Sequence, residues 1–289
     1  MQDVSNKSRA SGPPERDRTI GRRGVVAAGA AAVAAGLAAC GSTGTGSATE
    51  RASQTAAQST AARSASTRTT SAAVPAILGT DGPDIAAGPR TSNDIALTFH
   101  GAGPTSMAGR LLDILNGRRT RVTVFAVGTW AATNHPLLQR ILAEGHDLGS
   151  HTWSHRPMRT LSLAEADSEV ARGAAAVAAL RHGSGPLFRP SGTPTSTTII
   201  RAAAHAAGYH RCISYDVDSL DYTDPGPDAV VQNVLRSVRG GSIISLHFGH
   251  QGTVDALPKL LDVLAAKGFR PRTVTGLLSA PGDPVVVKN

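Results

Sequence analysis

The chain of 289 residues has few cysteines, few aromatic side chains and no long apolar run. Its two cysteines, Cys40 and Cys212, allow at most one bridge, which excludes a disulfide framework. Aromatic residues make up only 3% of the chain, too few for a surface that stacks nucleic-acid bases. The apolar run at residues 24–39 is shorter than the about 20 residues that a membrane-spanning helix needs. We therefore expect neither a disulfide scaffold nor a spanning helix.

The net charge of +8 is concentrated near the start of the chain. Nine basic and four acidic residues precede residue 71, and they account for five of the eight positive charges. The rest of the chain carries little net charge. A calculated isoelectric point of about 10.3 would otherwise suggest nucleic acid as a partner. With this distribution of charge we expect no nucleic-acid binding.

The first 40 residues have the order of an export signal. A basic stretch ends at Arg22-Arg23, an Ala/Gly/Val run follows, and small residues precede Cys40. The arginine pair resembles a twin-arginine signal, and Leu37-Ala-Ala-Cys40 resembles a bacterial lipobox. We predict that residues 1–40 are a lipoprotein signal peptide and that Cys40 is lipidated. The protein would then be exported and held by its lipid on the outer face of the bacterial cytoplasmic membrane, and Cys212 would be a buried small hydrophobic residue.

Composition divides the remainder into three parts. Residues 41–88 are mostly Ser, Thr, Ala and Gly, which indicates a disordered tether. Residues 89–280 form the predicted domain, and residues 281–289 a C-terminal tail. Within the domain, strand-like runs alternate with helical patterns, which is typical of a mainly parallel α/β sheet, either open or closed into a barrel. The expected strands are 95–99, 122–127, 147–150, 187–189, 212–216, 242–247 and 270–274, and the expected helices are 134–145, 163–180, 195–208, 227–238 and 254–267.

Chemically reactive side chains follow these strands. Parallel α/β folds place their sites at the carboxyl ends of strands, so these side chains are expected at one rim. His151-Thr-Trp-Ser-His155 is the most informative of them, because two neutral imidazoles four residues apart can bind one divalent ion such as zinc. The residues at the rim are His100, His151, His155, Arg189, Asp218, Asp221 and His247.

The motifs of residues 94–278 resemble those of the polysaccharide deacetylase family, also called the NodB-homology domain or carbohydrate esterase family 4. The similar segments are LTFHGAGP (97–104), VTVFAVG (122–128), AEGHDLGSHTWSH (143–155), LFRP (187–190), DSLDY (218–222) and ISLH (244–247). The resemblance implies a distorted (β/α)7 barrel. It also implies metal-dependent removal of acetyl groups, N-linked or O-linked, from a polysaccharide such as peptidoglycan.

The resemblance assigns a role to each matching residue. His151 and His155 would be metal ligands, His247 the general acid and Asp221 the carboxylate that orients it. Arg189 would lie beside the position of the catalytic base. Substrate would contact Tyr222, where the family usually has Trp, together with Leu246, and a backbone N–H near Gly192 would face the oxyanion.

The first motif departs from the family pattern. The family has Thr-Phe-Asp-Asp-Gly, which supplies the base and the acidic ligand, whereas this chain has Thr98-Phe99-His100-Gly101. We expect His100 to complete a three-histidine zinc site with His151 and His155. Three alternatives are that His100 takes the place of the base and leaves two ligands, that the domain is an inactive glycan-binding pseudo-deacetylase, or that it hydrolyses another substrate.

Overall fold

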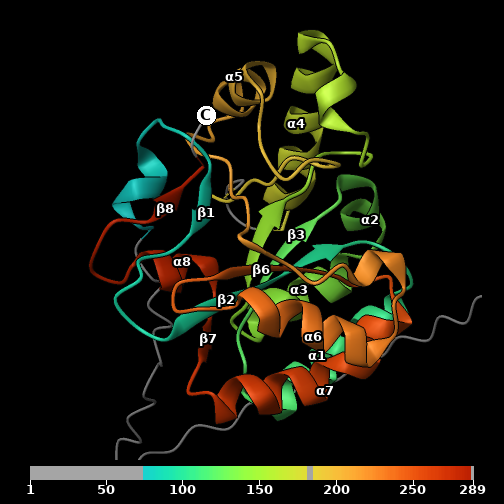
Figure 1. Cartoon of the computed structure of the whole chain (residues 1–289). Coiled ribbons are helices and arrows are strands. Elements are labelled where there is room, and N and C mark those ends of the chain that lie inside the picture. Colours follow the sequence, from blue (N-terminus) through green and yellow to red (C-terminus); the bar gives the residue numbers. More distant parts are fainter. Residues whose placement is uncertain (1–73, 181–184, 288–289) are drawn as a thin grey trace, which may run out of the picture. The chain divides into compact units, whose positions relative to one another are not determined.

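The computed structural model describes residues 74–180 and 185–287 (Figure 1). The predicted signal peptide, Cys40 and the tether up to residue 73 lie outside the described residues. The strands are β1 (Ile85–Ala87), β2 (Asp94–Gly101), β3 (Thr123–Ala126), β4 (Asp147–Ser150), β5 (Val217–Asp218), β6 (Ile243–His247), β7 (Arg270–Arg272) and β8 (Val285–Val286). The α-helices are α1 (Thr105–Gly117), α2 (Gly128–Thr133), α3 (His135–Ala143), α4 (Leu163–Ala178), α5 (Thr198–Ala206), α6 (Pro227–Ser237), α7 (Gln251–Ala266) and α8 (Val274–Leu278), and the short 3-10 helices are η1 (Ala76–Gly79), η2 (Met158–Thr160) and η3 (Asp221–Thr223).

The central sheet is parallel and has the strand order β4-β3-β2-β6-β5. Strand β7 pairs with the first residues of β2, from Asp94 to Ala96. The strands are rich in β-branched and aromatic residues, and β3 is buried along its whole length, as expected for a parallel sheet covered on both faces. The prediction of an α/β domain with a mainly parallel sheet is confirmed.

Two short segments close the sheet into a distorted barrel. Residues 187–189 lie beside β4, where the N–H of Ser150 donates to the carbonyl of Leu187. The N–H of Ile213 donates to the carbonyl of Phe188, and β5, a few residues further on, pairs with β6. The expected strands 187–189 and 212–216 are thus present as single bridges at Phe188 and Ile213 rather than full ladders.

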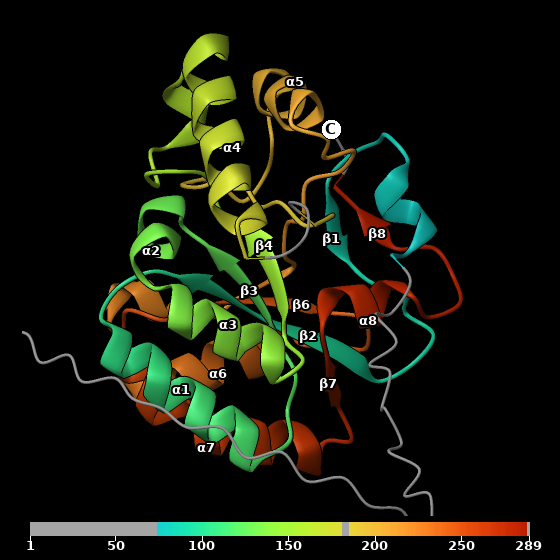
Figure 2. The ribbon, with the colours of Figure 1, turned by 180° about the vertical axis from the view of Figure 1, so that it is seen from behind.

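Helices cover the barrel, with α1, α3 and α7 at one end in Figure 2 and α4 and α5 at the other, where they pack on the bridged segments. Helix α7 packs against α1 and α6, and helix α4 against α2 and α5. All five predicted helices are present, with ends shifted by a few residues. Helix α1 was not predicted, although its buried residues Ala108, Leu111, Leu112 and Leu115 follow a helical period. Cys212 is buried beneath α4 and α5, as predicted. No helix in the described part of the chain is long and apolar enough to cross a membrane.

The folded domain begins earlier than the sequence indicated. Residues 74–88, which we assigned to the tether, contain η1 and β1, and Ile85 and Ala87 are fully buried. Their backbone is bonded too, because the N–H of Ile85 donates to the carbonyl of Cys212. Strand β8, from the expected tail, pairs antiparallel with β1. A short apolar strand preceded by polar sequence gives too little periodic signal to be recognised, which explains the misplaced boundary.

Candidate active site

The register of the sheet brings His100 and His247 together. Both lie at the ends of their strands, β2 and β6, where they are direct partners in the parallel ladder. Residues of the same parity point to the same face of a strand, so Thr98 and His100 face the barrel interior beside Ser245 and His247. Two members of the predicted rim of reactive side chains are therefore adjacent because their strands are neighbours in the sheet.

A chain of hydrogen bonds connects four predicted site residues. The Oδ1 of Asp221 lies 2.7 Å from Nδ1 of His247, and Nε2 of His247 lies 2.8 Å from Nδ1 of His100. The Nε2 of His100 lies 3.1 Å from NH1 of Arg189. A buried carboxylate and a buried guanidinium are thus linked through two imidazoles.

Arg189 is the end of this hydrogen-bond chain that the surrounding backbone holds in place. Its side chain is fully buried, and it donates to the carbonyls of Ile213 and Ser214 and to the hydroxyl of Thr98. Burial lowers the pKa of Arg189 to about 9, so the guanidinium remains charged at neutral pH. Arg189 also crosses the barrel and joins the bridged segment after Phe188 to β2.

The groups at the two ends, a donor at Arg189 and an acceptor at Asp221, fix the tautomers of His100 and His247, as assigned from the hydrogen-bond network. Arg189 can only donate, so Nε2 of His100 accepts and its proton is on Nδ1. His100 therefore donates to Nε2 of His247, and His247 carries its own proton on Nδ1, toward Asp221. Burial lowers the pKa of His100 well below its usual value, and the neighbouring histidines and Arg189 add to this effect. Both imidazoles are neutral in this arrangement.

Asp221 forms two hydrogen bonds with His247 and a third with Thr253. Its Oδ2 accepts from the backbone N–H of His247 at 2.7 Å and from the hydroxyl of Thr253 at 2.6 Å. Burial alone would raise the pKa of Asp221, but these bonds and that from His247 lower it below its usual value. Asp221 is therefore an anion that holds the ring of His247 in one orientation.

The His151–His155 segment leaves β4 as a tight loop rather than a helix. Thr152 and His155 both have positive φ, 63° and 62°, and the loop is held by the buried Glu169 of α4. The carboxylate of Glu169 accepts from the backbone N–H of Ser154 at 2.8 Å. Gly173 lets α4 approach, since a Cβ there would lie 2.5 Å from the backbone of Thr152. Glu169 is a supporting residue that the sequence motifs did not identify.

Two histidines of this loop fit a metal ion. The Nδ1 of His151 lies 2.8 Å from the carbonyl of Arg189, so it carries the proton and leaves a lone pair on Nε2. This Nε2 is buried and has no hydrogen-bond partner among the described residues. The rings of His151 and His155 lie 5.0 Å apart. A histidine whose second nitrogen bonds to a carbonyl is the usual arrangement of a metal ligand.

The three-histidine site predicted from the sequence is not preassembled in this structure. His100 stacks on His151 at 4.2 Å between ring centroids, but its nitrogens are bonded to Arg189 and His247. Within residues 74–180 and 185–287, the three histidines are not among the groups that bring three ligand atoms within 4.8 Å of one another. Position 101 cannot supply a metal ligand either, because a Cβ there would face Val124 and Ala126 in the core. His100 thus bonds to Arg189 and His247 in this structure, and its assignment as third ligand stays a prediction.

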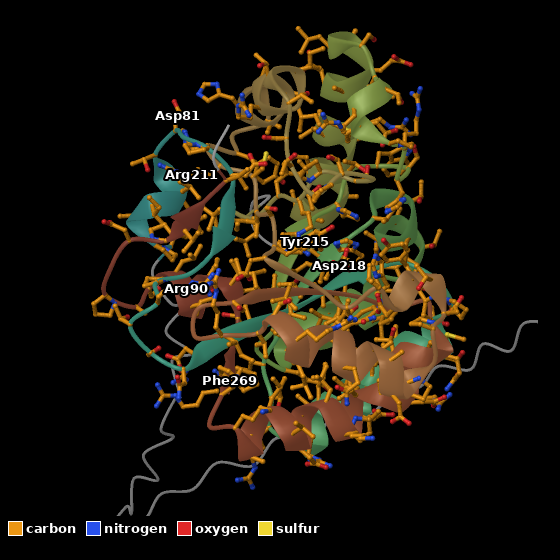
Figure 3. All side chains as sticks on the ribbon, in the orientation of Figure 1. Asp81, Arg90, Arg211, Tyr215, Asp218 and Phe269 are labelled. Atoms are coloured by element: carbon orange, nitrogen blue, oxygen red, sulfur yellow. The ribbon has the colours of Figure 1, made fainter. Side chains whose placement is uncertain are left out.

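A cavity of about 430 Å³ opens over these residues. Tyr222 and Gly192 line it, and the ring of Tyr222 lies 5.5 Å from that of His247. Leu246 is not among the lining residues, because strand alternation turns its side chain into the helix-covered core. Contact of these three residues with substrate stays a prediction. Tyr215 and Asp218 also line the cavity (Figure 3). Burial, with the nearby Asp218, raises the pKa of Tyr215 to about 12.

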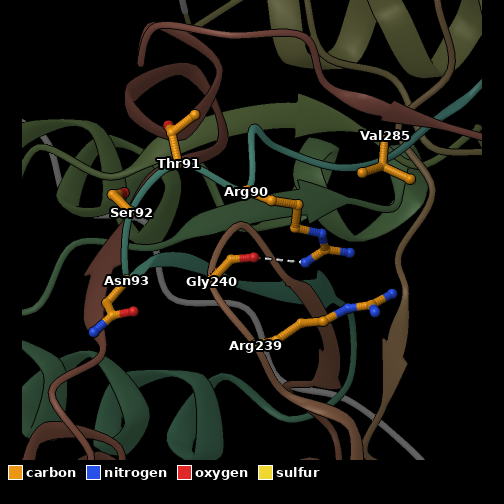
Figure 4. Close-up of a pocket in the computed structure, with 7 residues that line it drawn as sticks. All are labelled: Arg90, Thr91, Ser92, Asn93, Arg239, Gly240 and Val285. Carbon is orange, nitrogen blue, oxygen red and sulfur yellow. Dashed lines mark hydrogen bonds between the residues drawn. The ribbon is translucent and has the colours of Figure 1, made fainter.

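A second hollow, of about 580 Å³, lies near the other ends of the strands (Figure 4). Arg90 lines it and donates to the carbonyl of Gly240 at 2.7 Å. The same guanidinium forms an ion pair with Asp216 at 2.7 Å. These bonds join the segment before β2 to the segments before β5 and β6, so Arg90 stabilises the packing of these three segments.

Comparison with known proteins agrees with this geometry. The polysaccharide deacetylase model matches residues 87–212. A peptidoglycan-N-acetylglucosamine deacetylase of Bacillus cereus is 30% identical over 195 residues, which cover 66% of this chain and 90% of that protein. The chain belongs to the polysaccharide deacetylase family. Members of this family are metal-dependent deacetylases, hydrolases of carbon–nitrogen bonds, and the fold is theirs.

Solved structures of the family include both active and inactive members. A family 4 carbohydrate esterase from Streptomyces lividans, solved in complex with acetate, matches with a TM-score of 0.58 and 30% identity over 67% of this chain and 97% of that one. A pseudoenzyme of the same family from Bacillus anthracis matches with a TM-score of 0.63 and 25% identity over 68% of this chain and 69% of that one. A chitooligosaccharide deacetylase of Bradyrhizobium is 28% identical over 62% of this chain and 87% of that protein.

Proposed function

We propose that this protein is a deacetylase of an N-acetylated envelope polysaccharide, with a divalent ion, zinc, held by His151 and His155. The observation that carries the proposal is the buried Nε2 of His151, which has no hydrogen-bond partner among the described residues and lies next to the ring of His155. His155 lines the cavity together with His247. The bound ion would supply Lewis-acid polarisation of the acetyl carbonyl. Two protein ligands hold an ion less tightly than three, so we expect activity to depend on added metal.

His247 is the proton-transfer residue in this proposal. With its proton on Nδ1 toward Asp221, it has a lone pair on Nε2, which accepts from His100 in this structure and becomes free when substrate separates the two rings. That nitrogen takes a proton from the attacking water and later returns it to the leaving amine. Asp221 stabilises the imidazolium between these steps, as a carboxylate partner does in histidine catalysis. One histidine thereby does the work that the family divides between an aspartate and a histidine.

His100 is a hydrogen-bond donor rather than a base. Because Nε2 of His100 accepts from Arg189, its proton is on Nδ1 and can be donated to substrate. The ring then has no lone pair that faces the cavity and could accept a proton. When the reacting group of the substrate separates the rings of His100 and His247, the Nδ1–H of His100 donates to the acetyl oxygen. A positioned donor of this kind stabilises the developing oxyanion.

Peptidoglycan is the proposed polymer. The support is the similarity to a peptidoglycan-N-acetylglucosamine deacetylase over most of that protein's length and the resemblance of residues 1–40 to an export signal. A lipid on Cys40 would hold the domain at the outer face of the cytoplasmic membrane, where residues 41–73 would let it reach the wall.

A second candidate is a glycan-binding pseudo-deacetylase. The observation that favours it is the 2.8 Å bond between His100 and His247, which occupies the nitrogen that catalysis needs. The absence of a side chain at Gly101 favours it too, since the motif is left with no carboxylate. This protein would bind the polysaccharide in the cavity and release no acetate.

Acetate release decides between the candidates. Full-length protein is incubated with peptidoglycan and with chitin oligosaccharides, with zinc or with a chelator. We expect release that needs zinc and that His151→Ala abolishes, whereas His135→Ala, at an exposed histidine of α3, leaves it unchanged. His100→Ala should keep the metal and lose about 10²–10³-fold in turnover. Glycan binding that survives chelation, with no acetate from either substrate, would establish the pseudoenzyme instead.

A further inference from the structure

A second group of metal-ligating side chains lies on the surface, outside the cavity. Asp81 is in the loop between η1 and β1, His205 in the last turn of α5, and His210 in the loop that follows α5. All three are exposed. Figure 3 shows Asp81 above Arg211, at the edge of the molecule formed by η1 and β1. The catalytic arrangement uses none of these residues.

Their atoms lie close enough for all three residues to reach one ion, which would replace the hydrogen bond between Asp81 and His210. The Oδ1 of Asp81 lies 2.8 Å from Nδ1 of His210, and its Oδ2 lies 3.5 Å from Nε2 of His205. One nitrogen or oxygen from each residue lies within 4.8 Å of the others. Ligands about 2.0–2.1 Å from a tetrahedral ion are about 3.3 Å apart. The separation of Asp81 and His205 is therefore long for a hydrogen bond but close to that of two ligands.

The loop that carries Asp81 is held in shape by Arg211. Its guanidinium donates to the carbonyls of Thr80 at 2.9 Å, Asp81 at 3.2 Å and Pro83 at 3.2 Å. Gly82 makes this possible, because a Cβ there would lie 2.4 Å from the guanidinium carbon. Asp81 is thus fixed opposite the two histidines before any ion binds. The charge of Arg211 opposes a cation, so we expect affinity below that of buried structural zinc sites.

We propose that Asp81, His205 and His210 form a second divalent-metal site, selective for zinc and similar borderline ions. Two imidazoles and one carboxylate are ligands that suit such ions, and the exposed position leaves room for water as a further ligand. The bound ion joins the segment that begins the domain to the end of α5. It therefore stabilises the attachment of η1 and β1 to the barrel, independently of the chemistry in the cavity.

Zinc binding to the full, untagged chain tests this site. The background is His151→Ala with His155→Ala, which removes the cavity ligands, and Cys40→Ser, which removes an accessible thiol. Equilibrium dialysis gives zinc per chain, and thermal unfolding gives Tm with zinc and with a chelator. We expect one zinc per chain and a Tm that zinc raises.

Single substitutions then locate the ion. His205→Ala and His210→Ala should each weaken zinc binding by at least about tenfold and remove the zinc-dependent rise in Tm. His135→Ala removes an exposed histidine of α3 and should change neither. Equal Tm values in chelator show that the variants are folded. If the background chain binds no zinc at micromolar concentration, or if His205→Ala binds it as well as the background does, the site is refuted. Acetate release from the parent chain bears on the cavity alone and leaves this result unaffected.

Discussion

The hydrogen bonds of Asp221 determine what His247 can do. Both of its oxygens face donors, namely Nδ1–H and the backbone N–H of His247 and the hydroxyl of Thr253. Because the backbone N–H cannot reverse its role, the side chain at position 221 must offer it an acceptor. An asparagine there would turn its NH₂ group toward Nδ1 of His247 and move the imidazole proton to Nε2.

This geometry gives a prediction for two variants. His247→Ala should lower acetate release by about 10²–10⁴-fold, the usual contribution of a positioned acid or base. Asp221→Asn should lose a large part of the same activity, because Nε2 would carry a proton and no longer accept one from water. Kinetics with peptidoglycan measure both, and zinc content should stay at the parental level in each. Asp228→Asn, at an exposed aspartate paired with Lys259, is the control and should be fully active. Loss of zinc from His247→Ala would place His247 among the ligands and contradict this role.

The sequence predicted which residues meet at the site better than it predicted their bonds. His151, His155, Arg189, Asp221 and His247 were found because strand ends and motifs identify a rim. The partner of His100 could not be found in this way, since it depends on the strand register that places His247 beside it. Supporting groups such as Glu169 and Thr253 lie in helices 15 and 32 residues along the chain from Ser154 and Asp221, which they contact, and no local pattern marks them.

At the scale of elements, strand β1 was not predicted from the sequence, yet it contributes buried side chains and backbone hydrogen bonds to the domain. Ile85 is fully buried, and its N–H and carbonyl bond to the backbone of Cys212 and Ser214. Strand β1 thereby braces the bridged segment that closes the barrel beside Arg189. The helices were easier to predict, since α4 has both a capping box at Ser162 and a long apolar stripe.

Truncation of the buried side chain in β1 should therefore destabilise the whole domain. Ile85→Ala is expected to lower the free energy of unfolding by about 2–5 kcal/mol, because the cavity it leaves is lined by packed core. Urea unfolding followed by circular dichroism measures the change. Ile199→Ala, at an exposed isoleucine of α5, should have little effect. A fragment that starts at residue 89 should be less stable than one that starts at 74; equal stability of the two would show that β1 is dispensable.

At the scale of the whole molecule, the charge and the chemistry lie in different parts of the chain. Five of the eight net positive charges precede residue 71, and the described domain has the reactive histidines. The barrel could be predicted because its strands alternate with helices along the chain. Its closure could not, because it depends on single bridges at Phe188 and Ile213, which give no periodic signal.

The final prediction concerns where the molecule is held. If Cys40 is lipidated, the mature protein should begin at this residue and sediment with membranes, since a cysteine with more than one acyl chain anchors stably. Cys40→Ala should leave the precursor unprocessed or release the protein from the membrane fraction. Cys212→Ala is the matched control, because Cys212 is buried in the domain and should have no part in anchoring. Fractionation and mass spectrometry of the three proteins make the comparison. Should Cys40→Ala fractionate and migrate like the parent, the lipid anchor would be ruled out, and the domain would have to reach its polysaccharide without it.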